Sequence, residues 1–261
     1  MSTTIRFYGI AAFEIITSKN DHILIDPYIN ENWASPVKVK DLTKVDLILV
    51  THLALDHLGD AAEIQKKFGS IVVCGPEVKV FLMEQGVDAG MIRTVPWGGQ
   101  VNPLGIRVRG VECHHTSFRK SPQGHYLAGQ PLGFIVETEP GIRIYHSGDS
   151  AIFSDLKLIG ELYQPTVGLM CACEIEKDYL ESLGLKDHYG NEMSGDEGAL
   201  AAEWLGIKHA ILCHYLSNQN HKDIDLFLEH IEAYNQKNES KKIKTYVPNP
   251  GDETVIHAEE V

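Results

Sequence analysis

Histidine and carboxylate side chains recur in this sequence directly after predicted β-strands. One group follows the apolar run of residues 47–50, and three others follow the runs at 106–112, 143–146 and 210–212. Strand ends of this kind commonly present ligand-binding side chains, and neutral imidazoles and carboxylates bind zinc, manganese or iron. The pattern predicts a metal site assembled from distant loops, and its candidate residues are His52, Asp56, His57, His114, His115, His146, Asp149 and His214.

The elements that would position these residues are short strands and amphipathic helices. Strands are predicted at 4–8, 13–17, 22–25, 71–74 and 166–170, and the run at 47–50 predicts a strand buried on both faces. Helices are predicted at 61–68, from 76, at 154–162 and at 224–234, and a capping-box pattern at 194–197 precedes another at 199–205. The polar segment 114–129 is long enough to be a functional loop. Without a linker or an internal repeat, we expect residues 1–261 to form one domain of two packed sheets with outer helices.

Composition limits the partners of this domain. Its 36 acidic and 23 basic side chains give a formal net charge of -13, which disfavours binding to nucleic acid or to anionic lipid. No apolar stretch is long enough to cross a bilayer, and the first residues do not resemble a signal peptide. Five cysteines fit a reducing compartment better than a disulfide framework. We therefore expect a cytoplasmic protein, with Cys171 and Cys173 as core thiols.

The negative charge is uneven along the chain. Carboxylates are concentrated between residues 171 and 197, where lysines are few. A run of this kind is usually a solvated face or loop. The insert-like part at 174–192 is also a candidate for a lid or for an oligomer contact. In the second case the protein would form a homo-oligomer through this segment.

Taken together, the ordered motifs resemble those of the metallo-β-lactamase superfamily. They are Asp26-Pro27, Thr51-His52 with Asp56-His57-Leu58-Gly59-Asp60, His115-Thr-Ser, Tyr145-His146-Ser-Gly148-Asp149-Ser and His214-Tyr215. Within the superfamily, the pattern is most similar to small metal-dependent hydrolases related to L-ascorbate-6-phosphate lactonase. The resemblance implies an αββα sandwich of the α/β class, with a dinuclear site in the cleft between the sheets.

The resemblance also implies which residues bind the metals. One ion would take His52 and His115, the other would take Asp56, His57 and His214, and Asp149 would bridge both. His115 is preferred to His114 because it directly precedes Thr-Ser, as the histidine of the family motif does. One or two divalent ions are expected, and zinc and manganese both suit the ligands.

One position departs from the family pattern. The motif is His-x-His-x-Asp-His, and its second histidine is replaced here by Ala54. Three alternatives remain open. Another residue (His114, Cys113 or His22) supplies the missing ligand, the first metal site is weak or empty, or the protein is no longer an enzyme.

The expected activity is hydrolysis of a small ester-like substrate, such as a lactone with or without a phosphate group. A bound divalent ion lowers the pKa of its water toward about 7, and Asp56 would orient that water or accept its proton. Arg119, Lys120 and Tyr215 are candidates for binding the substrate. His146 is expected to support Asp149 from outside the ligand set, and Asp26 to be a structural hydrogen-bonding partner.

Other activities remain as alternatives. Among hydrolases, the same site could cleave a cyclic amide or a phosphodiester. Outside the enzymes, a degenerate member would bind a ligand without turnover. A two-iron, oxygen-reducing relative is less favoured because no flavin-binding domain accompanies this one, and a nuclease is disfavoured by the net charge of -13.

Overall fold

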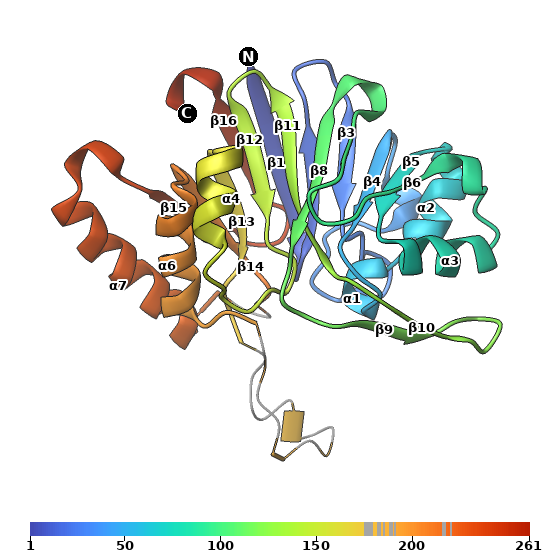
Figure 1. The fold of residues 1–261 in the computed structure, drawn as a ribbon. Helices are drawn as coiled ribbons and strands as arrows, with labels where there is room; N and C mark the ends of the chain where they lie inside the picture. Colours follow the sequence, from blue (N-terminus) through green and yellow to red (C-terminus); the bar gives the residue numbers. More distant parts are fainter. Residues whose placement is uncertain are drawn as a thin grey trace.

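A computed structural model describes residues 1–174, 180, 181, 184, 186, 187, 190, 192–215, 218, 219 and 221–261. The proposed lid or interface at 174–192 lies largely outside these described residues. The chain folds into two seven-stranded sheets packed face to face, with helices on both outer surfaces (Figure 1). This arrangement confirms the αββα sandwich expected from the sequence.

The first sheet combines antiparallel and parallel pairs. In spatial order its strands are β16 (Glu253–His257), β1 (Ser2–Gly9), β2 (Ala12–Ile16), β3 (His22–Ile25), β4 (Leu47–Val50), β5 (Ile71–Cys74) and β6 (Ile92–Thr94). On β4, Leu47 and Leu49 contribute to the core shared with the second sheet, whereas Ile48 and Val50 pack with the outer helices. The apolar run at 47–50 is therefore buried on both faces, as predicted.

The second sheet is also mixed. Its strands in spatial order are β15 (Lys244–Tyr246), β14 (His209–Cys213), β13 (Val167–Cys171), β12 (Ile142–His146), β11 (Leu132–Glu139), β8 (Arg107–Glu112) and β7 (Gln100–Val101). Strands β12 to β15 run parallel, because helices connect them across the outer face. Strands β11 and β12 form an antiparallel hairpin.

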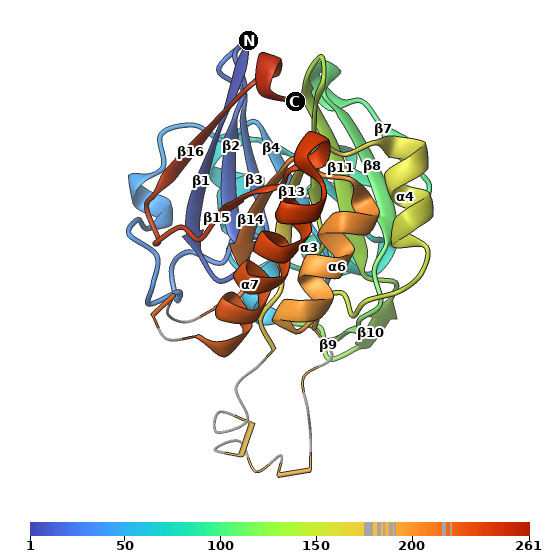
Figure 2. The same ribbon diagram turned by 90° about the vertical axis from the view of Figure 1, so that its left-hand side faces the viewer.

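Six α-helices are described. Five of them form layers on the outer faces of the two sheets, and the sixth is a single turn at the ends of the strands. Helices α2 (Ala61–Phe68) and α3 (Pro76–Glu84) cover the first sheet, and α4 (Leu156–Tyr163), α6 (Gly195–Leu205) and α7 (Lys222–Lys237) cover the second (Figures 1 and 2). The single turn α1 (Leu55–Leu58) follows β4. Short 3-10 turns lie at Val39–Asp41, Ala89–Met91, Pro103–Gly105, Glu239–Lys241 and Ala258–Glu260.

The capping box predicted before α6 is present. Ser194 accepts a hydrogen bond from the Glu197 amide, and the Glu197 carboxylate accepts one from the Ser194 amide. All five cysteines are free and buried, which confirms Cys171 and Cys173 as core thiols. Among the described residues, no helix combines the length and the apolar character needed to span a bilayer.

The segment predicted as a functional loop at 114–129 is more ordered than expected. It contains β9 (Ser117–Lys120) and β10 (Tyr126–Gly129), which form a separate antiparallel hairpin. In Figure 1 this hairpin runs below α1 and past α3. Contacts between β10 and α3 hold it against the body of the domain, so the segment predicted as a functional loop contains a packed β-hairpin.

Candidate metal centre

The candidate ligands meet at one edge of the sandwich. His52 follows β4 of the first sheet, and His115, Asp149 and His214 follow β8, β12 and β14 of the second. These strands end on the same side, shown at the bottom of Figure 1 beside α1. The carboxyl ends of strands from both sheets therefore bring residues from distant parts of the sequence together.

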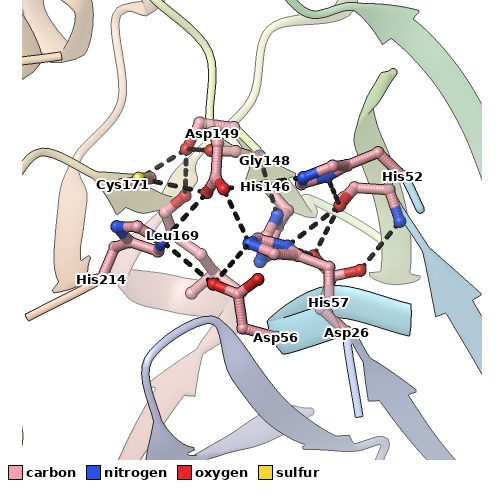
Figure 3. A network of polar contacts seen from close by, with 12 residues as sticks. Asp26, His52, Asp56, His57, His146, Gly148, Asp149, Leu169, Cys171 and His214 are labelled. Carbon is pink, nitrogen blue, oxygen red and sulfur yellow. Dashed lines mark hydrogen bonds and ion pairs between the residues drawn. The ribbon is translucent and has the colours of Figure 1, made fainter. Parts of the chain in front are cut away.

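Four potential ligands form what we call the Asp56 group: Asp56, His57, Asp149 and His214. Their ligand atoms all lie within 4.8 Å of one another. His57 Nε2 is 2.8 Å from Asp149 Oδ2, and His214 Nε2 is 3.5 Å from Asp149 Oδ1 and 3.6 Å from Asp56 Oδ2 (Figure 3). This group contains every ligand that the resemblance assigned to the second metal, including the bridging carboxylate.

Three potential ligands form what we call the His52 group: His52, His115 and Asp149. Their ligand atoms also lie within 4.8 Å of one another. His52 Nε2 is 3.7 Å from Asp149 Oδ2, and the His52 and His115 rings meet edge to face with centroids 5.0 Å apart. Asp149 belongs to both groups, as a bridging ligand would.

The donor atoms of both groups suit a divalent metal ion. Among the described residues, His52 Nε2, His115 Nδ1 and His214 Nε2 are buried without a hydrogen-bond partner. Leaving a buried nitrogen unpaired costs about 1–3 kcal/mol. A metal ion bound between these nitrogens and the carboxylates of Asp56 and Asp149 would remove that cost, and such mixed nitrogen and oxygen ligands are typical of zinc and manganese sites.

Ala54 precedes α1 as its N-cap residue and offers only its backbone. None of the three proposed substitutes belongs to either ligand group. His114 Nε2 is paired with Glu112, and its ring stacks on Phe153. His22 is paired with Glu14, and Cys113 is a buried free thiol. The His52 group therefore has one imidazole fewer than the family pattern, with no replacement among the described residues.

Asp26 occupies the turn after β3 and orients His57. Its Oδ2 atom lies 2.7 Å from His57 Nδ1, and it accepts hydrogen bonds from the amide and hydroxyl of Thr51. This contact directs Nε2 of His57 toward Asp149. Although complete burial raises the pKa of Asp26, the charge of His57 lowers it further, so the net pKa lies below its ordinary value. Asp26 is therefore a buried hydrogen-bonding partner of His57 and Thr51.

His146 lies beneath the turn that carries Asp149. Its Nδ1 accepts a hydrogen bond from the Gly148 amide at 3.0 Å, and it belongs to neither ligand group. Gly148 has a φ of 56°, and a Cβ there would lie 3.0 Å from the Leu132 carbonyl oxygen. The sharp turn therefore requires glycine, and His146 accepts the hydrogen bond of that glycine's amide.

Burial and nearby negative charge have opposite effects on the pKa values of the candidate histidine ligands. Burial and the neighbouring His57 lower the pKa of His52 to about 3. Burial also lowers the pKa of His214, but the carboxylates of Asp149 and Asp56 outweigh this effect and raise it to about 9. The same carboxylates raise the pKa of His57 despite its burial. The Asp56 group therefore attracts positive charge strongly, as a cation site should.

The three candidate substrate-binding residues lie outside both ligand groups. Arg119 donates to the Leu53 carbonyl and lies over the Phe81 ring. Lys120 is exposed on the hairpin. Tyr215 is buried, and its hydroxyl donates to the carbonyl of Pro248. That bond engages the Tyr215 proton with the backbone of Pro248 and not with either ligand group.

Two further residues contact the candidate ligands or the turn beside them, and neither was predicted from the sequence. The Cys171 thiol donates to Asp149 Oδ1 at 3.4 Å, and its position at the end of β13 is the same signal that marked the histidines. Asp60 accepts hydrogen bonds from the amides of Ile29 and Asn30 and so fixes the turn after Asp26. Its place after the Asp56-His57 pair did not reveal this contact, because the partners are distant in sequence.

Comparison with known proteins identifies the superfamily of this chain. Residues 21–215 match the profile of the Beta-lactamase superfamily domain. The chain belongs to this superfamily. A UPF0173 metal-dependent hydrolase of Rubrobacter xylanophilus is 35% identical over 214 residues, which cover 82% of this chain and 81% of the relative. A second relative of that name, from Archaeoglobus fulgidus, is 37% identical over 213 residues, covering 81% of this chain and 82% of its own.

Solved structures share the whole fold. Igni18, a metallo hydrolase from the archaeon Ignicoccus hospitalis, superimposes with a TM-score of 0.72 at 25% identity, covering 98% of this chain and 99% of its own. A possible metal-dependent hydrolase from Veillonella parvula has a TM-score of 0.71 at 19% identity, covering 97% and 99%; at that identity the likeness concerns the fold alone. The superfamily, the fold and the class of metal-dependent hydrolase expected from the sequence are confirmed.

Proposed function

We propose that this chain hydrolyses a small ester-like substrate, such as a lactone with or without a phosphate group, with one or two zinc or manganese ions. The observation that carries the proposal is the Asp56 group. Its imidazoles and carboxylates converge at one point, and 36% of the Asp56 side chain is exposed whereas only 4% of Asp149 is. The site is therefore both a cation site and open to solvent beside one carboxylate.

The roles of the residues follow from their burial. Asp149 and His57 are buried, the side chain of His214 is only 8% exposed, and these three residues would hold the ion or ions together with Asp56. A bound divalent ion would supply an activated water and would polarise the carbonyl or phosphoryl oxygen of the substrate. Asp56 has one carboxylate oxygen near His57 and His214, which leaves the other free to orient the water or to accept its proton.

The hairpin β9–β10 supports the second half of the proposal, an anionic group on the substrate. Lys120 is exposed there, next to Arg119, in the segment that begins at His115. Arg119 is engaged with the Leu53 carbonyl, so Lys120 is the better candidate to meet a phosphate. We propose a small-molecule substrate rather than nucleic acid because the net charge is -13.

The setting in the cell is part of the same proposal. All five cysteines are free thiols, which supports a reducing compartment such as the cytoplasm. A homo-oligomer remains a proposal linked to the acidic stretch 174–192.

The test starts with protein purified without chelator. We expect bound zinc or manganese by elemental analysis, and hydrolysis of lactones or phosphorylated lactones in a panel that also contains cyclic amides and phosphodiesters. Turnover of only the cyclic amides or phosphodiesters would replace the proposed substrate class. Absence of bound metal from the purified protein would reject the proposed hydrolase function. It would favour the alternative that the chain binds a ligand without turnover.

The variant Asp56→Ala should lose at least about a hundredfold in hydrolysis, because both a metal ligand and the proposed proton acceptor are removed. Exposed carboxylates elsewhere should tolerate the same change, and Glu239, on a 3-10 turn remote in sequence, is a suitable control. Full activity and full metal content in Asp56→Ala would end the assignment of this residue.

A further inference from the structure

A buried carboxylate outside both ligand groups contacts the hairpin next to the site. Glu77 lies in the first turn of α3 and is only 5% exposed. Its Oε1 atom accepts a hydrogen bond of 2.7 Å from the Ser117 hydroxyl of β9. A buried carboxyl group needs such a partner to offset the loss of water, so this contact ties α3 to the hairpin.

The hairpin is shaped to receive this carboxyl group. Ser117 pairs with Gly129 across the two strands, and a Cβ at Gly129 would lie 2.2 Å from Glu77 Cδ. A Cβ at Gly75, before α3, would lie 2.5 Å from Glu77 Oε2. Glycine at both places lets the backbone approach Glu77 more closely than any other residue would permit.

Ser117 also contacts the loop that carries the proposed metal ligands. Its hydroxyl oxygen accepts a hydrogen bond of 3.2 Å from the Leu53 amide, and Arg119, two residues further along β9, donates to the Leu53 carbonyl at 3.3 Å. Leu53 directly follows His52, and Ala54 provides no side-chain contact to hold the loop. Both backbone groups of Leu53 are therefore held by the hairpin.

We propose that Glu77 is a positioning residue, which through Ser117 and Leu53 fixes the loop of His52, Asp56 and His57 relative to His115. This chain of contacts, Glu77–Ser117–Leu53, is called the brace below. The expected effect of the brace on metal binding rests on the proposed function. The contacts of the brace themselves are present in the metal-free chain.

The first experiment measures amide hydrogen exchange of Leu53 by NMR in metal-free protein. Ser117→Ala removes the acceptor, and Glu77→Ala releases Ser117, so each should speed exchange at Leu53 about tenfold. Gly129→Ala should act in the same direction, because its methyl group displaces the Glu77 carboxyl. Wild-type exchange at Leu53 in Glu77→Ala would overturn the proposal.

Conservative and control variants separate positioning from general stability. Glu77→Gln keeps a carbonyl oxygen that can accept the hydrogen bond of Ser117 and removes a charge that burial disfavours, as the raised pKa of Glu77 indicates. Exchange should therefore stay within about threefold of wild type. Val78→Ala weakens the same helix through a buried apolar side chain, and it should leave Leu53 protected. Protection lost equally in Val78→Ala would overturn a specific role of the brace.

A second control lies at the far end of the hairpin. Glu84 also belongs to α3, and it contacts the Gln123 amide and His125 Nδ1 near the hairpin tip. Glu84→Gln should not change exchange at Leu53. An effect as large as that of Glu77→Ala would mean that any tether of the hairpin suffices, which contradicts the proposal.

The second experiment measures zinc affinity. Glu77→Ala and Ser117→Ala should raise the zinc dissociation constant about tenfold, as loss of supporting contacts commonly does, and Glu77→Gln should restore it. Unchanged zinc affinity in both disruptive variants would overturn the link between brace and metal site. A wild-type protein without zinc affinity would instead reject the proposed function, while hydrogen exchange would still decide whether the brace exists.

Discussion

Asp26 and His57 form a buried carboxylate–imidazole pair, and this pair sets the tautomer of a proposed ligand. Asp26 Oδ2 lies 2.7 Å from His57 Nδ1, so the carboxylate favours a proton on Nδ1 and leaves Nε2, which faces Asp149, as the nitrogen that would bind a metal ion. An asparagine at position 26 could present its NH2 group instead and would no longer demand that tautomer.

We predict that Asp26→Asn weakens zinc binding roughly 10–100-fold, as replacement of a carboxylate behind a histidine ligand generally does. Isothermal titration with zinc measures the effect. Glu14→Gln is a matched control, because Glu14 is another buried carboxylate and lies 2.7 Å from His22 Nδ1, outside the ligand groups. Equal zinc affinities of Asp26→Asn and Glu14→Gln would contradict the orienting role.

His214 makes the stability of the metal-free protein depend on pH. Its pKa is raised to about 9 in the folded chain, against an ordinary value of about 6.5. The folded state therefore binds this proton more tightly than the unfolded state. The resulting stabilisation is complete below the unfolded pKa and is lost as pH rises through the folded pKa.

Urea unfolding of wild type and of His214→Gln, with chelator present, measures this dependence on pH. The contribution that His214 makes to the free energy of unfolding should shrink as pH rises from about 6.5 to 9. A difference between the two proteins that does not vary with pH across this window would contradict the raised pKa.

At the scale of elements, Gly59 determines how closely α1 approaches the turn after β3. Its φ is 42° and its ψ is -127°, and a Cβ would lie 2.4 Å from the Pro27 carbonyl oxygen. Glycine is required at this point for both conformational and steric reasons. The contact places Asp26 and His57 within reach of each other.

We predict that Gly59→Ala destabilises the fold by more than about 3 kcal/mol, because steric overlap adds to backbone strain. Gly69→Ala is the matched control, since Gly69 also has a positive φ of 69° but no atom within 4 Å of the place that its new methyl group would occupy. That change should cost only about 1–2 kcal/mol. Urea unfolding of both variants checks the difference, and similar losses would show that close packing at Gly59 is unimportant.

Local sequence signals predicted the elements that local interactions determine. The capping box before α6 and the doubly buried strand β4 are examples, since a few neighbouring residues specify each. The edge strand β16 was not predicted, because its identity depends on pairing with β1 at the other end of the chain. The hairpin β9–β10 escaped for a related reason: its order comes from packing on α3.

The same distinction applies to the site. The histidines and carboxylates could be identified from the sequence because they follow strands and match a family pattern. The roles of Glu77 and Ser117 could not, since Glu77 has no ligand-type spacing and its partner is distant in sequence. The engagement of Tyr215 with Pro248 likewise depends on a tertiary contact.

At the scale of the whole molecule, metal binding should raise the stability of the fold. An ion that binds the folded chain alone adds about 2.7 kcal/mol at a free concentration one hundred times its dissociation constant. For a domain of this size, that gain corresponds to a rise of roughly 5–10 °C in Tm.

Thermal unfolding with zinc and with chelator measures this shift. His57→Ala removes a buried member of the Asp56 group and should abolish most of the rise. A rise of the same size in His57→Ala would show that zinc stabilises the protein from another place.

The shared position of Asp149 has a consequence for how the protein matures. Its partners in the Asp56 group come from α1, which follows β4 of the first sheet, and from the residue after β14 of the second, far apart in the sequence. No growing chain can therefore present the complete Asp56 group before His214 has been synthesised and β14 has joined its sheet. Metal uptake by the complete Asp56 group would consequently be a late event in biogenesis, and metal bound there would report that both sheets have been assembled.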